Sequence, residues 1–217
     1  YVALGAWPER VHAIGSVKFD MSLDDTVRQA AAGLRAEIGE RPVWIAASTH
    51  PGEDEPVLAA HKSLLKTLPT ALLVLVPRHP ERFGSVAQLV RHQSLTLARR
   101  SKQEAIAADT QVYLADTMGE LLMLFGVADV AFVGGSLVPV GGHNLLEPAA
   151  WGKPVVTGPH LHNFAAISEL LDKADALTLV DNADALAITL QGLFRHPDRR
   201  QSQGQAAAAA VEAHRGA

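Results

Sequence analysis

The chain has 217 residues, of which 48% are hydrophobic and 19% charged, a composition typical of a globular protein with a sizeable core. The formal net charge of −4 provides no general attraction to nucleic acid, so an anionic ligand must be held by a local site. The absence of cysteine excludes disulfide bonds and thiolate metal sites, and no apolar run reaches the roughly 18 residues that a membrane span needs.

The first twenty residues do not follow the alternation of strands and helices that the rest of the sequence shows. We expect residues 1–20 to be a linker that ends in VKFD (Val17–Asp20), and residues 21–217 to form one domain. Because Tyr1 is not an initiator methionine, we also expect an upstream part of the protein to precede this chain.

Short runs rich in apolar and β-branched residues predict the strands of this domain. Their side chains are apolar almost without interruption, which is typical of a parallel sheet covered by helices on both faces. The predicted strands are Val43–Ser48, Leu72–Val76, Val112–Ala115, Val130–Val133, Pro154–Thr157 and Leu177–Val180, and Ser94–Ala98 is a further candidate.

Longer segments with helical periodicity separate these strands. Ser22 is expected to cap the first helix, and the acidic residues Glu53–Glu55 suit the positive end of the second. The predicted helices are Ser22–Ile38, Glu53–Thr67, Arg82–Val90, Gly119–Phe125, Leu145–Trp151, Asn163–Lys173, Ala183–Phe194 and Arg199–His214. This alternation predicts an α/β fold with a doubly wound, Rossmann-like parallel sheet.

Ligands of such sheets bind beyond the carboxyl ends of the strands, so the loops that follow the strands form the candidate site. Ser48 and Thr49 follow the first strand and could offer hydroxyl donors, although they also suit a plain Pro-Gly turn. Arg78, with His79 beside it, follows the second strand, where a guanidinium group could hold a phosphate. The alternative for Arg78 is an ion pair with Glu81.

The polar loop DTMGEL is expected to be a tight turn that leads into a helix. The free N–H groups of this turn, which contains Gly119 and Glu120, could bind an anion or the edge of a base, and Met118 could lie flat on a base. The alternative is that Asp116 or Thr117 caps the helix while Met118 fills the core.

Two glycine pairs follow the strand Val130–Val133. They would let the backbone approach a phosphate closely through Gly134, Gly135, Ser136 and Gly142. The pattern is neither the GxGxxG fingerprint of dinucleotide-binding sheets nor a P-loop, so it indicates a phosphate site without naming the ligand.

Asn144 and Glu147 begin the next helix. The Glu147 carboxylate could accept hydrogen bonds from two ribose hydroxyls, and the alternative is a capping box with Asn144, which would compete for the same carboxylate. Although His143, His160 and His162 are close in sequence, neither an HExxH pattern nor a strong Asp-x-Asp element is present. We therefore expect no metal site and no cofactor.

Four segments together resemble one known family, the Kdo transferases of Gram-negative bacteria, which add 3-deoxy-D-manno-octulosonic acid (Kdo) to lipid A precursors. The segments are STHPGEDE (Ser48–Glu55), PRHPERF (Pro77–Phe83), DTMGEL (Asp116–Leu121) and FVGGSLVPVGGHNLLEPAAWGKPVVTGPHLHNF (Phe132–Phe164). The segment VKFD (Val17–Asp20) is similar to the linker between the two domains of that family. The resemblance covers nearly the whole chain, in order.

This resemblance implies the GT-B architecture, in which two Rossmann-like domains face each other across a cleft. The chain would be the C-terminal half, and its donor would be CMP-Kdo. The resemblance places Arg78 and Asn144 at the phosphate of the donor and Glu147 at its ribose. It also places Met118, Gly119 and Glu120 in the nucleotide pocket, with Gly134 to Ser136 nearby.

The resemblance also implies inversion at the anomeric carbon without a metal, with the general base on an N-terminal domain that this chain lacks. No catalytic residue is therefore expected here. The lipid A precursor, as acceptor, and contact with the cytoplasmic face of the bacterial inner membrane would belong to the complete enzyme. We expect this chain to be a soluble fragment that binds CMP or CMP-Kdo without turnover.

Two other functions fit the same loops. One is the donor-binding half of another GT-B enzyme that uses a UDP-sugar, such as a UDP-hexosamine transferase or a UDP-GlcNAc epimerase. The other is a non-catalytic nucleotide-binding module. An NAD-dependent dehydrogenase is disfavoured, because no GxGxxG follows the first strand.

Overall fold

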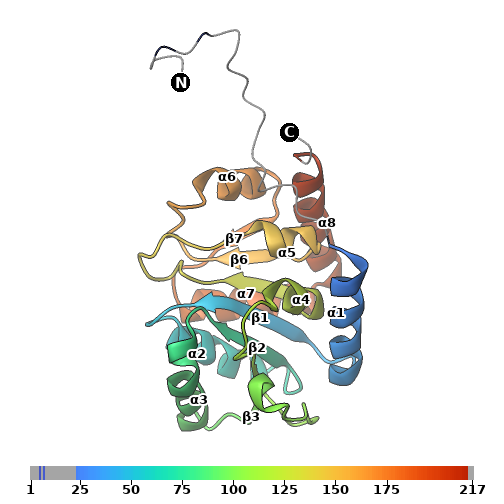
Figure 1. The fold of residues 1–217 in the computed structure, drawn as a ribbon, viewed down its shortest axis with the longest axis vertical. Coiled ribbons are helices and arrows are strands. Elements are labelled where there is room, and N and C mark those ends of the chain that lie inside the picture. The colour runs from blue at the N-terminus through green and yellow to red at the C-terminus, as the bar shows by residue number, and fades with distance from the viewer. Residues whose placement is uncertain (1–4, 6, 8–22, 215–217) are drawn as a thin grey trace.

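The computed structural model describes Gly5, Trp7 and residues 23–214, so the linker predicted for residues 1–20, with VKFD, lies almost entirely outside the described part. Within that part, seven strands form one parallel sheet in the order β3-β4-β2-β1-β5-β6-β7 (Figure 1). The strands are β1 (Val43–Thr49), β2 (Leu72–Pro77), β3 (Leu97–Arg99), β4 (Val112–Leu114), β5 (Val130–Val133), β6 (Val155–Thr157) and β7 (Leu177–Leu179).

Helices cover both faces of the sheet, and each face has its own hydrophobic core. Successive side chains of a strand point to opposite faces, so Val43 and Ile45 enter one core while Trp44 and Ala46 enter the other. One face carries α1 (Asp25–Ile38), α4 (Leu121–Val127), α5 (Leu146–Ala150), α6 (Ala165–Lys173) and α8 (Pro197–Glu212), and the other carries α2 (Asp54–Leu65), α3 (Phe83–His92) and α7 (Ala183–Arg195). The 3₁₀ turns η4 (Pro80–Arg82) and η5 (Arg100–Lys102) follow β2 and β3. The prediction of a doubly wound α/β fold is confirmed.

The direction of winding reverses between β1 and β5. From β1 the chain adds β2, β3 and β4 on one side, and then returns to place β5 on the other side of β1. The loops that leave β1 and β5 therefore diverge, and a crevice opens beyond their carboxyl ends. This topological switch point is where the candidate loops of the sequence converge.

The element boundaries agree closely with the sequence, with two exceptions. The candidate strand at 94–98 is displaced to Leu97–Arg99. The predicted start of the first helix is wrong: Ser22 lies outside the described residues, and α1 begins at Asp25. Asp24 caps this helix because its carboxylate accepts a hydrogen bond from the Val27 N–H at 2.8 Å.

A buried histidine joins three segments at the amino ends of the strands. Trp44 Nε1 of β1 donates to His61 Nδ1 of α2 at 3.1 Å, and His61 Nε2 lies 2.8 Å from the carbonyl oxygen of Gln111, before β4. Because Nδ1 accepts, Nε2 carries the proton of a neutral ring. Complete burial lowers the pKa of His61 to about 4.

This histidine makes the stability of the domain depend on pH. Between pH 6.5 and about 4, His61 stays neutral in the folded state while the unfolded chain takes up a proton, so folding stability falls as the pH falls. We expect His61 to contribute a slope of about 1.4 kcal/mol per pH unit to the free energy of unfolding in this window.

Urea unfolding at several pH values between 4 and 7 measures this slope. The matched variant is His61→Gln, whose amide can accept from Trp44 and donate to the Gln111 carbonyl but does not titrate. The variant should lose the histidine's share of the slope. Equal slopes in the two proteins would contradict the prediction.

Candidate functional site

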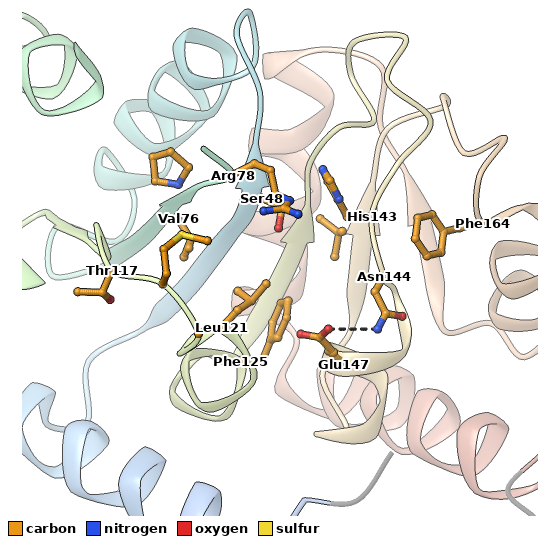
Figure 2. Close-up of a pocket in the computed structure, with 14 residues that line it drawn as sticks. Ser48, Val76, Arg78, Thr117, Leu121, Phe125, His143, Asn144, Glu147 and Phe164 are labelled. Carbon is orange, nitrogen blue, oxygen red and sulfur yellow. Dashed lines mark hydrogen bonds between the residues drawn. The ribbon is translucent and has the colours of Figure 1, made fainter. Parts of the chain in front are cut away.

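A cavity of about 300 Å³ lies at the switch point, beyond the carboxyl ends of β1, β2 and β5 (Figure 2). Its lining side chains come from all four of the polar loops that the sequence singled out, together with the start of α6. The lining residues are Ser48, Val76, Pro77, Arg78, Thr117, Met118, Gly119, Leu121, Phe125, Val133, His143, Asn144, Glu147 and Phe164.

The structure divides the predicted site residues into two groups. Those that line the cavity are Ser48, Arg78, Met118, Gly119, Asn144 and Glu147. Those that do not line it are Thr49, His79, Glu120, Gly134, Gly135, Ser136 and Gly142. Most members of the second group are engaged in hydrogen bonds within the protein, and the His79 ring contacts His50.

Arg78 extends into the site from the end of β2. Its backbone N–H is held by the Thr49 carbonyl at 3.0 Å, which fixes the loop to the neighbouring strand. Its side chain is exposed and forms no ion pair with a described residue, so the alternative pairing with Glu81 is absent from this structure. A guanidinium group without a partner at a cavity wall is available for an anion.

Asn144 and Glu147 lie across the end of β5 from Arg78 (Figure 2). Asn144 Oδ1 accepts from the Leu146 N–H at 3.1 Å, and Asn144 Nδ2 donates to Glu147 Oε1 at 3.1 Å. Burial raises the pKa of Glu147. The expected competition between pairing with Asn144 and binding a ligand is therefore avoided at Glu147. The Asn144 side-chain amide engages only Oε1 of the Glu147 carboxylate, and Oε2 has no partner among the described residues.

Met118 and Gly119 form the opposite wall of the cavity. Met118 is 56% exposed, so the alternative that it fills the core is wrong. Gly119 has a φ of +81°, a conformation that glycine adopts without strain and that turns the chain into α4. Leu121 and Phe125 of α4 add an apolar floor, and the combination can hold a flat, partly apolar ring.

Glu120 does not face this cavity. Its carboxylate accepts from Arg100 Nε at 2.7 Å and from the Thr117 hydroxyl, and it lines a neighbouring polar cavity instead. Asp116 is likewise not a helix cap, because it accepts from Arg99 Nε at 2.7 Å and from the Ser101 N–H at 2.8 Å. Both acids tie the loop to η5, and the Glu120 side chain therefore lines the neighbouring cavity and not this one.

The backbone N–H groups of the glycine-rich turn after β5 are occupied by a side chain of the protein itself. The N–H groups of Gly135, Ser136 and Leu137 donate to the Glu53 carboxylate at 2.7, 3.0 and 2.9 Å. The expectation that this turn offers its amides to a phosphate is therefore wrong, and so is the assignment of Glu53 to a helix dipole alone. Gly142 also serves the loop itself, since its N–H donates to the Gly135 carbonyl at 2.7 Å.

Thr49 is a structural residue as well. Its side chain is fully buried, and Oγ1 donates to Asp54 Oδ1 at 2.7 Å. Asp54 in turn forms an ion pair with Arg82 of η4, whose guanidinium group also donates to the Thr49 carbonyl. Of the two hydroxyl-bearing residues at the end of β1, Ser48 is the one that lines the cavity, and it has a φ of +58°.

His143 lines the cavity, although the sequence pointed to it only as a metal ligand. Its Nε2 lies 2.8 Å from His50 Nε2 and the two rings stack with centroids 5.0 Å apart, while His79 meets His50 edge-on at 5.2 Å. Burial, with a contribution from His50, lowers the pKa of His143 to about 4, and burial also lowers that of His50. One of the two Nε2 atoms donates to the other, and the lowered pKa values of both rings favour their neutral forms near pH 7.

The signal that could have identified His143 is its place between a glycine pair and Asn144 at a strand end. Its partner His50 follows β1, and the residues meet only because β1 and β5 are neighbours. Phe164 also lines the cavity and was not predicted from the sequence. It comes from the turn before α6, and no local pattern distinguishes it from a core residue.

Several known proteins are similar to this chain in sequence and in fold. The chain is 43% identical to the Kdo transferase of Haemophilus influenzae over 100% of its length, and 39% identical to that of Bordetella pertussis over 94%. It superposes with a TM-score of 0.83 on the C-terminal CMP-Kdo binding domain of WaaA from Acinetobacter baumannii, at 34% identity, covering 87% of this chain and 100% of that one. This chain belongs to the Kdo transferase family.

The match places the chain within the family as its C-terminal, GT-B-type half, as the resemblance implied. It spans about half the length of the curated Kdo transferases, 51% and 48% of the two relatives above. HepE from Anabaena, solved with UDP-glucose, has the same fold at 14% identity and a TM-score of 0.63. No protein-family model matches the chain.

Two further properties concern the described part of this Kdo transferase domain. None of the helices there is long and apolar enough to span a bilayer. The same residues contain no group of three or more His, Cys, Asp or Glu side chains that could hold a metal ion. His143 pairs with His50, and His162 lies beside Gly141, where a Cβ would come within 2.6 Å of His162 Nε2.

The buried ion pair under the site predicts a large stability effect. Arg82→Met should lower the free energy of unfolding by about 3 kcal/mol, because it leaves the Asp54 carboxylate buried without its cation. Arg91→Met on the exposed side of α3 is the matched control and should change stability by less than about 0.5 kcal/mol. Urea denaturation of both variants measures the difference, and similar values would contradict a structural role for the pair.

Proposed function

We propose that this domain binds CMP-Kdo, and that within the complete enzyme it presents Kdo for transfer to a lipid A precursor. The observation that carries the proposal is the cavity at the switch point, in which an unpaired Arg78 lies opposite the Asn144–Glu147 pair. The structural similarity to a CMP-Kdo binding domain supports this choice of donor.

The cavity has groups that suit the base, the ribose and the phosphate of a cytidine nucleotide. Met118 and the turn at Gly119 would hold the base, since the thioether is polarisable and the backbone is exposed. Glu147 would accept hydrogen bonds from ribose hydroxyls through the oxygen that Asn144 leaves free. Ser48 and Arg78 would bind the phosphate.

Transfer breaks the bond between the phosphate oxygen and the anomeric carbon of Kdo, and forms a bond between that carbon and the acceptor's hydroxyl oxygen. The phosphate of CMP gains one negative charge as it leaves, and Arg78 would stabilise that charge. The acceptor hydroxyl must lose a proton to a general base, and we propose that this base, the lipid A binding surface and the contact with the cytoplasmic face of the inner membrane belong to the N-terminal half of the enzyme.

Nucleotide titration of the purified chain tests the binding site. Arg78→Gln should weaken binding of CMP about tenfold or more while leaving cytidine unchanged, because only CMP carries the phosphate. Glu147→Gln should weaken both, since both carry the ribose, and it keeps the acceptor for Asn144 Nδ2. Isothermal calorimetry provides the affinities.

The control for these variants is Arg91→Gln, an exposed arginine on α3 outside the cavity, which should bind like the wild type. Binding of UMP or UDP tighter than CMP by the wild-type chain would overturn the choice of donor and favour a UDP-sugar enzyme. Weak binding that does not depend on the base would favour a nucleotide-binding module.

A transfer assay tests the division of labour between the two halves. With CMP-Kdo and a lipid A precursor, we expect no turnover by this chain alone, and transfer by the complete enzyme that Arg78→Gln reduces about tenfold or more. Kdo transfer by the isolated chain at the rate of the complete enzyme would show that the base lies in this domain.

A further inference from the structure

The turn at residues 134–137 is an anion-binding concavity that already holds an anion. Consecutive backbone N–H groups of this kind bind phosphates in many α/β proteins. Here the Glu53 carboxylate accepts hydrogen bonds from the three N–H groups of the turn, and it accepts a fourth from the His50 N–H at 2.9 Å. The Glu53 side chain is fully buried.

The fit between the carboxylate and the turn leaves no room for another group. A Cβ at Gly134 would lie 2.8 Å from Glu53 Oε2 and 2.9 Å from the Ser48 carbonyl oxygen, closer than such atoms approach. Gly135 has a φ of +66° and a Cβ there would meet the His143 ring at 2.8 Å. The turn is thus held between Glu53 on one side and a cavity-lining histidine on the other.

Only one residue separates the Glu53 carboxylate from the cavity wall. Glu53 Oε2 accepts from the His50 N–H at 2.9 Å, and His50 Nε2 lies 2.8 Å from Nε2 of His143, which lines the cavity. A donor with two phosphates would bring its second phosphate to the end of β5, where it would find no free amide on the turn and would meet a like charge.

We propose that Glu53 is a specificity-determining residue that stands in for a second phosphate and restricts the site to donors with one phosphate between nucleoside and sugar. This inference depends on the proposed function, because it concerns the same cavity. It explains why the turn is glycine-rich and has the shape of a phosphate-binding turn without contacting the donor. The protein supplies its own anion, the Glu53 carboxylate, at that position.

The test compares CMP with CDP, which differ by one phosphate, by calorimetry on the wild-type chain and on Glu53→Gln, Glu53→Ala and Glu53→Asp. The wild type should bind CDP no more tightly than CMP. Glu53→Gln removes the charge and Glu53→Ala vacates the turn, so both should shift the affinity ratio toward CDP by about tenfold or more. Glu53→Asp keeps the charge and should stay within about threefold of the wild-type ratio.

Glu55→Gln is the matched control, since Glu55 is an exposed carboxylate on the same helix and should leave the ratio unchanged. Because vacating the turn leaves four backbone amides without their acceptor, two of them buried, Glu53→Ala should unfold at a lower temperature, and formate should raise that temperature selectively by entering the turn.

The outcomes separate this inference from the proposed function. A wild-type chain that binds no CMP would refute the proposed function. A wild-type chain that binds CMP but binds CDP tenfold more tightly would refute the role of Glu53 alone, as would Gln and Ala variants that keep the wild-type ratio while still binding CMP.

Discussion

The Glu53 carboxylate holds together the two loops between which the donor cavity opens. It accepts hydrogen bonds from four backbone amides, one in the loop after β1 and three in the loop after β5. Hydrogen bonds to an ionised acceptor are about twice as strong as neutral ones, and these lie in a buried environment that strengthens them further. The divergent strand ends at the switch point are thereby fixed to each other, and the positions of Ser48 and His143 follow from that constraint.

The residues that line the cavity give it a simple distribution of charge. Among its lining residues, Arg78 carries the positive charge and Glu147 the negative one, on opposite sides of the end of β5. His143 adds no charge near neutral pH, because burial and its neighbour His50 disfavour protonation. A ligand with one anionic group and one group of hydroxyl donors matches this arrangement, which is the chemistry of a nucleoside monophosphate.

The sequence predicts most of the fold because buried parallel strands are apolar throughout, and their order along the chain limits the topology. It also predicts Arg78, Asn144 and Glu147 at the cavity, since loops that follow neighbouring parallel strands must meet at one edge. It does not predict what fills the glycine-rich turn. Glycines indicate that something approaches the backbone closely, but Glu53 lies 82 residues before Gly135 and only the pairing of β1 with β5 brings them together.

The same limitation applies to residues whose partner is distant in sequence. Glu120 has the expected position in its loop, yet its ion pair with Arg100, twenty residues earlier, turns it away from the cavity. His143 shows the reverse, since the sequence placed it beside His160 and His162, while the fold pairs it with His50, 93 residues away. A side chain's type and strand-end position predict membership of a site only when no stronger internal partner competes for it.

The groups around the cavity also bear on where the chemistry of transfer takes place. An efficient general base has a pKa near the working pH, and burial holds that of His143 at about 4, which makes it a weak proton acceptor. Glu147 is oriented by Asn144 and lies on the side of the cavity opposite Arg78, where the ribose of the proposed donor would bind. These properties support the proposal that this domain recognises the donor and stabilises its leaving phosphate, and that a group outside the cavity activates the acceptor.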